Sequence, residues 1–186
     1  MEIIGINHLL IDPNFIVAPE TRAKLILITH EHPDHFRKEA VSYGERILAP
    51  DSAIEEFKLK GAIEVKEGMN IENVEVVKSF CWKSKHSVGY LIKDEFRVLH
   101  LGDSFKCPEV KVDLIFVPTF KEYHEDILEM VRKSEAKCAI PIHFDSSKEE
   151  RLAIAKDLVD KIRLLEVKSQ ILEVGKWADV KNLLSP

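Results

Sequence analysis

The chain has 186 residues, of which 45% are hydrophobic and 32% charged, a composition typical of one soluble globular domain over residues 1–186. Only seven glycines and eight prolines are present, which excludes the disordered and fibrous classes. No uninterrupted apolar run approaches the roughly 18 residues that span a bilayer. The net charge of −5 argues against a dedicated nucleic-acid binder.

The ends and the cysteines of the chain indicate its compartment. Position 2 is acidic, and neither a basic stretch nor a small-residue cleavage site follows it, so we predict no signal peptide. The three cysteines, Cys81, Cys107 and Cys138, are odd in number, widely spaced and without a CxxC pair. This usage indicates a reducing compartment and thiols that are buried or incidental. We therefore expect a cytoplasmic protein with no membrane segment.

Short apolar runs predict strands, and longer amphipathic runs predict helices. In chain order, the expected strands are residues 3–11, 25–29, 46–49, 62–65, 71–80, 88–92, 96–101, 114–117, 139–142 and 170–174. The expected helices are residues 33–43, 52–59, 122–134 and 148–164. Several early strands are joined by turns too short for a helix, which favours antiparallel meanders. The pattern predicts two sheets with helices outside them.

The most informative segment follows an apolar run and contains His30, His32, Asp34 and His35. In an extended segment His30 and His32 point the same way, so their imidazoles can bind one metal ion. Pro33 favours a turn into a helix, which would direct Asp34 and His35 toward a neighbouring position. Two ligand directions suit two metal ions, which lie roughly 3.5–4 Å apart in hydrolytic sites. The alternative is a polar loop that contains histidines by chance, which composition predicts about once per thousand such sequences.

This segment resembles the metallo-β-lactamase superfamily, whose mark is His-x-His-x-Asp-His after an apolar strand. Three later stretches match the family in order: His86 precedes an apolar strand, Asp103 stands in a Gly-Asp pair after a strand, and His143 follows a late strand. Asp12, in an early Ile-Asp-Pro stretch, is similar to a strand end of the simple hydrolases. The matches cover residues 25–143, and the general resemblance is to small stand-alone hydrolases of the ascorbate-lactonase-like kind.

The resemblance implies both the fold and the metal ligands. The fold is α+β, a four-layer αβ/βα sandwich of two mixed β-sheets with helices on the outer faces. One ion would be bound by His30, His32 and His86, a second by Asp34, His35 and His143, and Asp103 would bridge both. A histidine at position 32 is more similar to the zinc hydrolases than to the iron-binding redox branch. We therefore expect two divalent metal ions, Zn²⁺ first, with Mn²⁺ or Fe as alternatives.

Five further residues are candidates for contacts around the metal ions or with a substrate. Asp12 is either a carboxylate that orients a ligand imidazole or a turn acid. His124 is either an exposed helix residue or a proton donor that reaches into the cleft. Trp82, Lys83 and Lys85 precede the third histidine, and they either hold an anionic or aromatic group or form a solvated loop.

The implied activity is metal-dependent hydrolysis, in which a metal-bridging water or hydroxide attacks an ester, lactone, amide or phosphodiester. Asp34 or Asp103 would orient this nucleophile. We expect a small-molecule substrate, anionic if the two lysines contact it, and a hydrolase of this size is compatible with a homo-oligomer. Two alternatives stay open: a non-catalytic metal-binding protein with a partner or regulatory role, and an RNA nuclease. The net charge and the absence of an inserted clamp domain disfavour the nuclease.

Overall fold

The computed structural model describes residues 2–3, 8–106, 108–176 and 178–185. The chain forms two compact units, Met1–Asp94 and Glu95–Pro186, called the N-terminal and C-terminal units below. Residues 4–7, part of the strand predicted over residues 3–11, lie outside the described residues. Cys107 also lies outside them.

The N-terminal unit contains a mixed sheet whose strands follow the order β1-β2-β3-β4-β5. Their bounds are Glu2–Ile3, Leu9–Ile11, Ala23–Leu27, Gly44–Ala49 and Ile63–Glu64. β1 pairs with β2 in antiparallel fashion, whereas β2, β3, β4 and β5 are parallel to their neighbours. The expected antiparallel meander is therefore wrong for this sheet, because each parallel pair is joined by a connection long enough to return the chain to the same edge.

The same unit contains a three-stranded antiparallel segment, β6 (Asn70–Ile71), β7 (Val74–Lys78) and β8 (Val88–Lys93). One strand was predicted over residues 71–80. The chain instead turns at Glu72, which has a φ of +55°, and β7 folds back on β6. The predicted meander is present here.

The prediction of a helix over residues 33–43 is wrong for residues 33–37. Only a 3₁₀ segment, η1 (Lys38–Tyr43), forms, and Arg37 before it is extended. The backbone groups that an α-helix would use are bonded elsewhere: the Asn14 side-chain amide donates to the Asp34 carbonyl at 3.1 Å, and the Arg37 backbone amide donates to the Pro13 carbonyl at 3.3 Å. The next helix, α1 (Asp51–Phe57), lies where the pattern predicts it.

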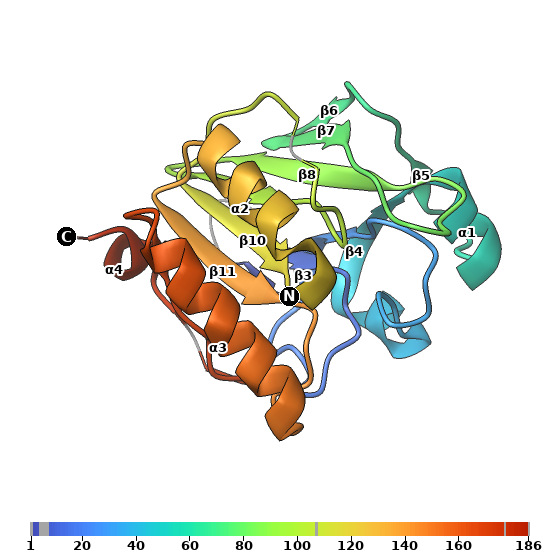
Figure 1. The fold of residues 1–186 in the computed structure, drawn as a ribbon. Helices are drawn as coiled ribbons and strands as arrows, with labels where there is room; N and C mark the ends of the chain where they lie inside the picture. Colours follow the sequence, from blue (N-terminus) through green and yellow to red (C-terminus); the bar gives the residue numbers. More distant parts are fainter. Residues whose placement is uncertain (1, 4–7, 107, 177, 186) are drawn as a thin grey trace. The chain divides into compact units, whose positions relative to one another are not determined.

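In the C-terminal unit, β9 (Arg97–His100), β10 (Leu114–Pro118), β11 (Cys138–Ile142) and β12 (Lys168–Ser169) pair in parallel in that order. Helices α2 (His124–Lys133) and α3 (Glu149–Arg163) lie side by side over β10 and β11 (Figure 1). A 3₁₀ turn, η2 (Lys121–Tyr123), precedes α2, and α4 (Val180–Leu184) ends the unit. The strand predicted over residues 170–174 is wrong, because the short pairing with β11 ends at Ser169.

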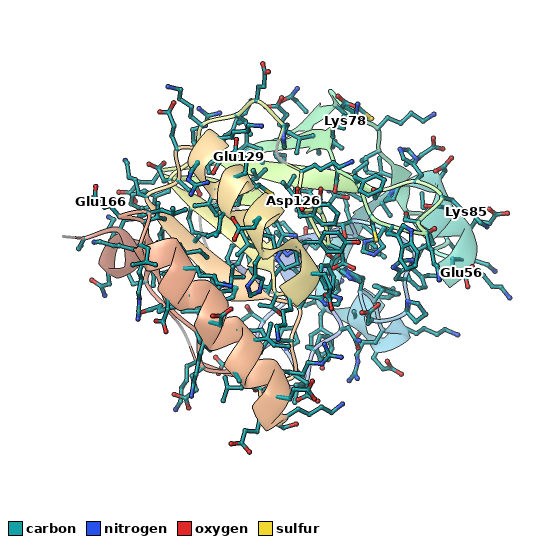
Figure 2. The ribbon with its side chains drawn as sticks, viewed as in Figure 1. Glu56, Lys78, Lys85, Asp126, Glu129 and Glu166 are labelled. Carbon is teal, nitrogen blue, oxygen red and sulfur yellow. The ribbon has the colours of Figure 1, made fainter. Side chains whose placement is uncertain are left out.

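Helix α2 shows why these helices pack against the sheet. Ile127, Leu128 and Val131 are buried at helical spacing, whereas Asp126 and Glu129 are exposed on the opposite side (Figure 2). Among the described residues, no helix is long and apolar enough to cross a membrane.

Tyr90 connects β8 to the strands that lead into the metal-binding motif. Its side chain is fully buried, and its hydroxyl lies 2.8 Å from the Ile28 carbonyl and 3.2 Å from the Leu48 carbonyl. Burial raises the pKa of Tyr90 well above its ordinary value, so the hydroxyl keeps its proton as a donor. The contact holds the end of β3 beside β4, directly before His30.

We expect Tyr90→Phe to lower the free energy of unfolding by about 1–2 kcal/mol, because buried carbonyl groups lose their donor. Urea unfolding followed by circular dichroism measures the change. Tyr123→Phe is the matched control, since the Tyr123 side chain is 41% exposed. Equal unfolding curves for wild type and Tyr90→Phe would contradict the role of the hydroxyl.

Candidate metal centre

The first pair of predicted ligands lies just beyond the end of β3. His30 is fully buried, and its Nε2 lies 3.1 Å from Nδ1 of His32. Two imidazole nitrogens on one tetrahedral zinc ion, each 2.0–2.1 Å from it, would be about 3.3 Å apart. The two nitrogens therefore have the spacing that a shared divalent ion requires.

Asp12 and Thr29 orient the imidazoles of this segment. The carboxylate of Asp12 accepts hydrogen bonds from the backbone amide and the hydroxyl of Thr29, both at 2.7 Å, and lies 2.9 Å from Nδ1 of His35. The Thr29 hydroxyl is in turn 2.9 Å from Nδ1 of His30. Since Nδ1 of both rings is bonded in this way, Nε2 is the nitrogen that each can offer to a metal.

Asp34 and His35 form the next part of the motif. Asp34 is exposed and His35 is buried, and one ligand atom of each lies within 4.8 Å of the other. The His35 ring also packs on His30, with 4.0 Å between the ring centroids. The structure thus brings His30, His32, Asp34 and His35 together, as the spacing predicts.

His86 lies in the loop between β7 and β8, which we call the 79–87 loop. Its Nδ1 is 2.7 Å from the carboxylate of Asp51, at the start of α1. The hydrogen bond with His86 lowers the pKa of Asp51. The pairing of a ligand imidazole with a carboxylate is common in metal sites, and it leaves Nε2 as the donor nitrogen.

Glu31, between the two ligand histidines, anchors the 79–87 loop. Its buried carboxylate accepts hydrogen bonds from the Lys85 backbone amide at 2.6 Å and the Ser84 hydroxyl at 2.8 Å, and it lies 3.0 Å from the Ser52 hydroxyl. Burial raises the pKa of Glu31, but the hydrogen bonds outweigh it and leave the pKa below its ordinary value. Glu31 was not predicted from the sequence, because its partners Ser52, Ser84 and Lys85 are distant along the chain.

Cys81 is a second residue near the predicted ligands that was not itself predicted as one. Its sulfur is buried and lies 3.6 Å from Nδ1 of His32, and the ligand atoms of His30, His32 and Cys81 all lie within 4.8 Å of one another. The thiol is buried, which is one of the two expectations stated for the cysteines. Its place five residues before His86, in the loop expected to carry a ligand, was the available signal.

The C-terminal unit brings two further predicted ligands together. Asp103 is buried after β9, His143 follows β11, and the Nε2 atom of His143 lies 3.4 Å from the Asp103 carboxylate. Parallel neighbouring strands end at the same edge, which explains the meeting. The Thr119 hydroxyl, after β10, donates to the His143 carbonyl at 3.2 Å, and Gly102 turns the chain with a φ of +59°.

His124 is not the exposed residue that one reading of the sequence suggested. It is buried, and its Nδ1 lies 3.3 Å from both the Asp157 carboxylate and the Lys161 ammonium group on α3. Burial, and then the charge of Lys161, lowers the pKa of His124. These contacts tie α2 to α3.

The remaining candidates are exposed residues of the 79–87 loop. The Lys83 ammonium group lies over the Trp82 ring, 4.2 Å from its centroid, and the Trp82 side chain is 69% exposed. Lys85 is also exposed, at the outer surface of the N-terminal unit (Figure 2). The loop thus displays two aromatic rings, Phe80 and Trp82, and two cationic groups to solvent.

Comparison with known proteins assigns the family. Residues 2–143 match the model of the β-lactamase superfamily domain. A UPF0173 protein from Pyrococcus furiosus is 32% identical over 166 residues, covering 77% of this chain and 78% of the relative. A UPF0173 metal-dependent hydrolase from Thermococcus onnurineus is 27% identical, covering 78% of this chain and 80% of the relative.

Solved structures show the same fold. A metallohydrolase from Ignicoccus hospitalis has a TM-score of 0.67 at 18% identity, covering 93% of this chain and 90% of that one. A Thermotoga maritima protein, assigned as a Zn-dependent hydrolase of the metallo-β-lactamase superfamily, has a TM-score of 0.58 at 18% identity, with 89% of each chain covered. The chain belongs to the metallo-β-lactamase superfamily. The predicted family and its α+β fold are confirmed.

We expect Glu31→Gln to release the 79–87 loop, because a side-chain amide cannot accept all the hydrogen bonds that the carboxylate accepts. Hydrogen exchange at the Lys85 amide should become faster, with a loss of about 1–3 kcal/mol in unfolding free energy. The exposed Glu56, changed to Gln, is the control. Unchanged exchange in this loop would show that Glu31 is not its anchor.

We expect Asp12→Asn to weaken metal binding about 10–100-fold, because the variant side chain no longer fixes the His35 and Thr29 hydrogen bonds as a carboxylate does. Asn tolerates the φ of +43° at this position, so the backbone should persist. Competition with a chromophoric chelator measures the affinity. Asp126→Asn, on the exposed side of α2, should leave it unchanged.

Proposed function

We propose that the chain is a hydrolase that uses two divalent metal ions, preferentially Zn²⁺, to cleave an ester, lactone or phosphodiester. The chain is a metal-dependent hydrolase by family, and relatives that cover most of its length bear that description. The single observation that carries the proposal is the 3.1 Å approach of His30 Nε2 to His32 Nδ1, with Nδ1 of His30 bonded elsewhere. Residues 1–186 would form one catalytic domain.

The proposed ligands follow the family motif residue by residue. In the N-terminal unit they are His30, His32, Asp34, His35 and a donor from the 79–87 loop, where the sequence predicts His86. In the C-terminal unit they are Asp103 and His143. Imidazole and carboxylate donors fit zinc and also accept manganese or iron. When bound, the ions would supply a nucleophilic water and polarise the substrate oxygen.

The protein residues have separate roles in this reaction. Asp34 and Asp103 would orient the attacking water and accept its proton at a carboxylate oxygen. Asp12 would hold the His35 ring in one orientation. The cationic groups of Lys83 and Lys85, beside the exposed Trp82, would contact an anionic small-molecule substrate.

Purified protein should contain about two metal ions per chain and cleave an activated phosphodiester or lactone. Asp103→Ala should lower kcat/KM at least about 100-fold, because a group that positions the water and takes its proton is lost. Elemental analysis and a panel of chromogenic substrates measure both quantities. Asp126→Ala is the matched control, an exposed aspartate on α2 of the same unit. Fewer than one ion per chain, or equal activity in Asp103→Ala, would overturn the proposal.

A further inference from the structure

The 79–87 loop places a sulfur atom beside the first pair of metal ligands. Cys81 Sγ lies 3.6 Å from His32 Nδ1, which itself lies 3.1 Å from His30 Nε2. His30 and Cys81 are buried, with Cys81 only 7% exposed, and His32 is partly buried. The Cys81 thiol therefore lies close to the imidazoles of both His30 and His32.

Both distances match those of donors that share one tetrahedral ion, and the ligand atoms of Cys81 and His30 lie within 4.8 Å of each other. With zinc–nitrogen distances of 2.0–2.1 Å and a zinc–sulfur distance of about 2.3 Å, two nitrogens would be about 3.3 Å apart and a sulfur about 3.6 Å from a nitrogen. The observed separations differ from these by a few tenths of an ångström at most. A shared ion therefore needs little movement of the side chains.

We propose that Cys81 is a metal ligand, and that its thiolate binds the same ion as His30 and His32. The inference rests on the proposed function, and it adds a second donor from the 79–87 loop to the predicted His86. The predicted donor His86 keeps its role, because its contact with Asp51 at Nδ1 leaves Nε2 as the donor nitrogen, and Cys81 is a second donor from the same loop.

The loop is built to hold the sulfur in this position. The Cys81 backbone amide donates to the Ser87 hydroxyl at 3.1 Å, which joins the two ends of the loop. Glu31 bonds Ser84 and Lys85 in its middle. Because Glu31 lies between His30 and His32, one segment of backbone positions both the imidazoles and the loop that carries the thiol.

A thiolate ligand has consequences for the ion. As the metal–sulfur bond forms, the sulfur replaces a water of the hydrated ion, and the thiol proton passes to solvent. Two imidazoles and one thiolate leave the fourth position of a tetrahedral ion for one further donor. A soft sulfur donor also favours zinc over manganese, which accepts mainly oxygen ligands.

Cobalt substitution tests the assignment without an activity assay. Co²⁺ bound to a thiolate has an intense sulfur-to-cobalt charge-transfer band in the near ultraviolet, which imidazole and carboxylate ligands do not produce. We expect this band in the wild-type protein and in a Cys107→Ser/Cys138→Ser double variant, where Cys81 is the sole cysteine. We expect it to be lost in Cys81→Ser. The band persisting in Cys81→Ser, or missing from cobalt-loaded wild type, would overturn the proposal.

X-ray absorption at the zinc edge gives a second measurement that needs only the wild-type protein. We expect a sulfur scatterer at about 2.3 Å. A shell of nitrogen and oxygen alone, in protein that holds zinc, would reject Cys81 as a ligand and leave the proposed function standing. Protein that retains neither zinc nor cobalt would reject both, so the two failures are distinguishable.

Discussion

The buried carboxylate of Glu31 holds together the parts of the N-terminal unit that concern metal binding. An anion in this position is costly to bury, and the hydrogen bonds from Ser84 and Lys85 offset that cost. The same residue separates His30 from His32, whose ring nitrogens approach to 3.1 Å. One short segment thereby sets the direction of two ligands and fixes the loop that contains Cys81 and His86.

Carboxylates also set the orientation of other candidate ligands. Asp12 lies against His35 and Asp51 against His86, each at Nδ1. Such partners select one tautomer and one ring orientation before any ion binds. A site organised in this way loses little conformational entropy on binding, because the rings already occupy their bound rotamers.

The sequence could predict the features that depend on local spacing. The alternation of His30 and His32 and the Gly-Asp turn at Asp103 are short-range patterns, and the strands that carry them form where expected. The family and fold were predictable because these patterns recur in a fixed order. The parallel pairing of β2 to β5 was not, since short turns elsewhere in the chain suggested antiparallel strands.

Contacts between distant segments explain what the sequence could not predict. The 33–43 helix shortens because Pro13 and Asn14 bond the backbone groups that it needs. Cys81 approaches His32 across 49 residues, and Glu31 reaches Lys85 across 54. No local sequence pattern indicates these partners, because the folding of the loops brings them together. Secondary-structure propensity does not determine such contacts.

Asp12 and His143 share an unusual backbone, with φ values of +43° and +62°. For residues with a Cβ this region costs about 1–2 kcal/mol, and glycine would relieve it. At both positions glycine would remove a polar side chain that contacts a candidate ligand: Asp12 contacts His35, and His143 contacts Asp103. Selection for thermal stability alone would therefore drift toward glycine here, whereas selection for metal binding would preserve the strain. These two positions mark where the demands of stability and function oppose each other in this chain.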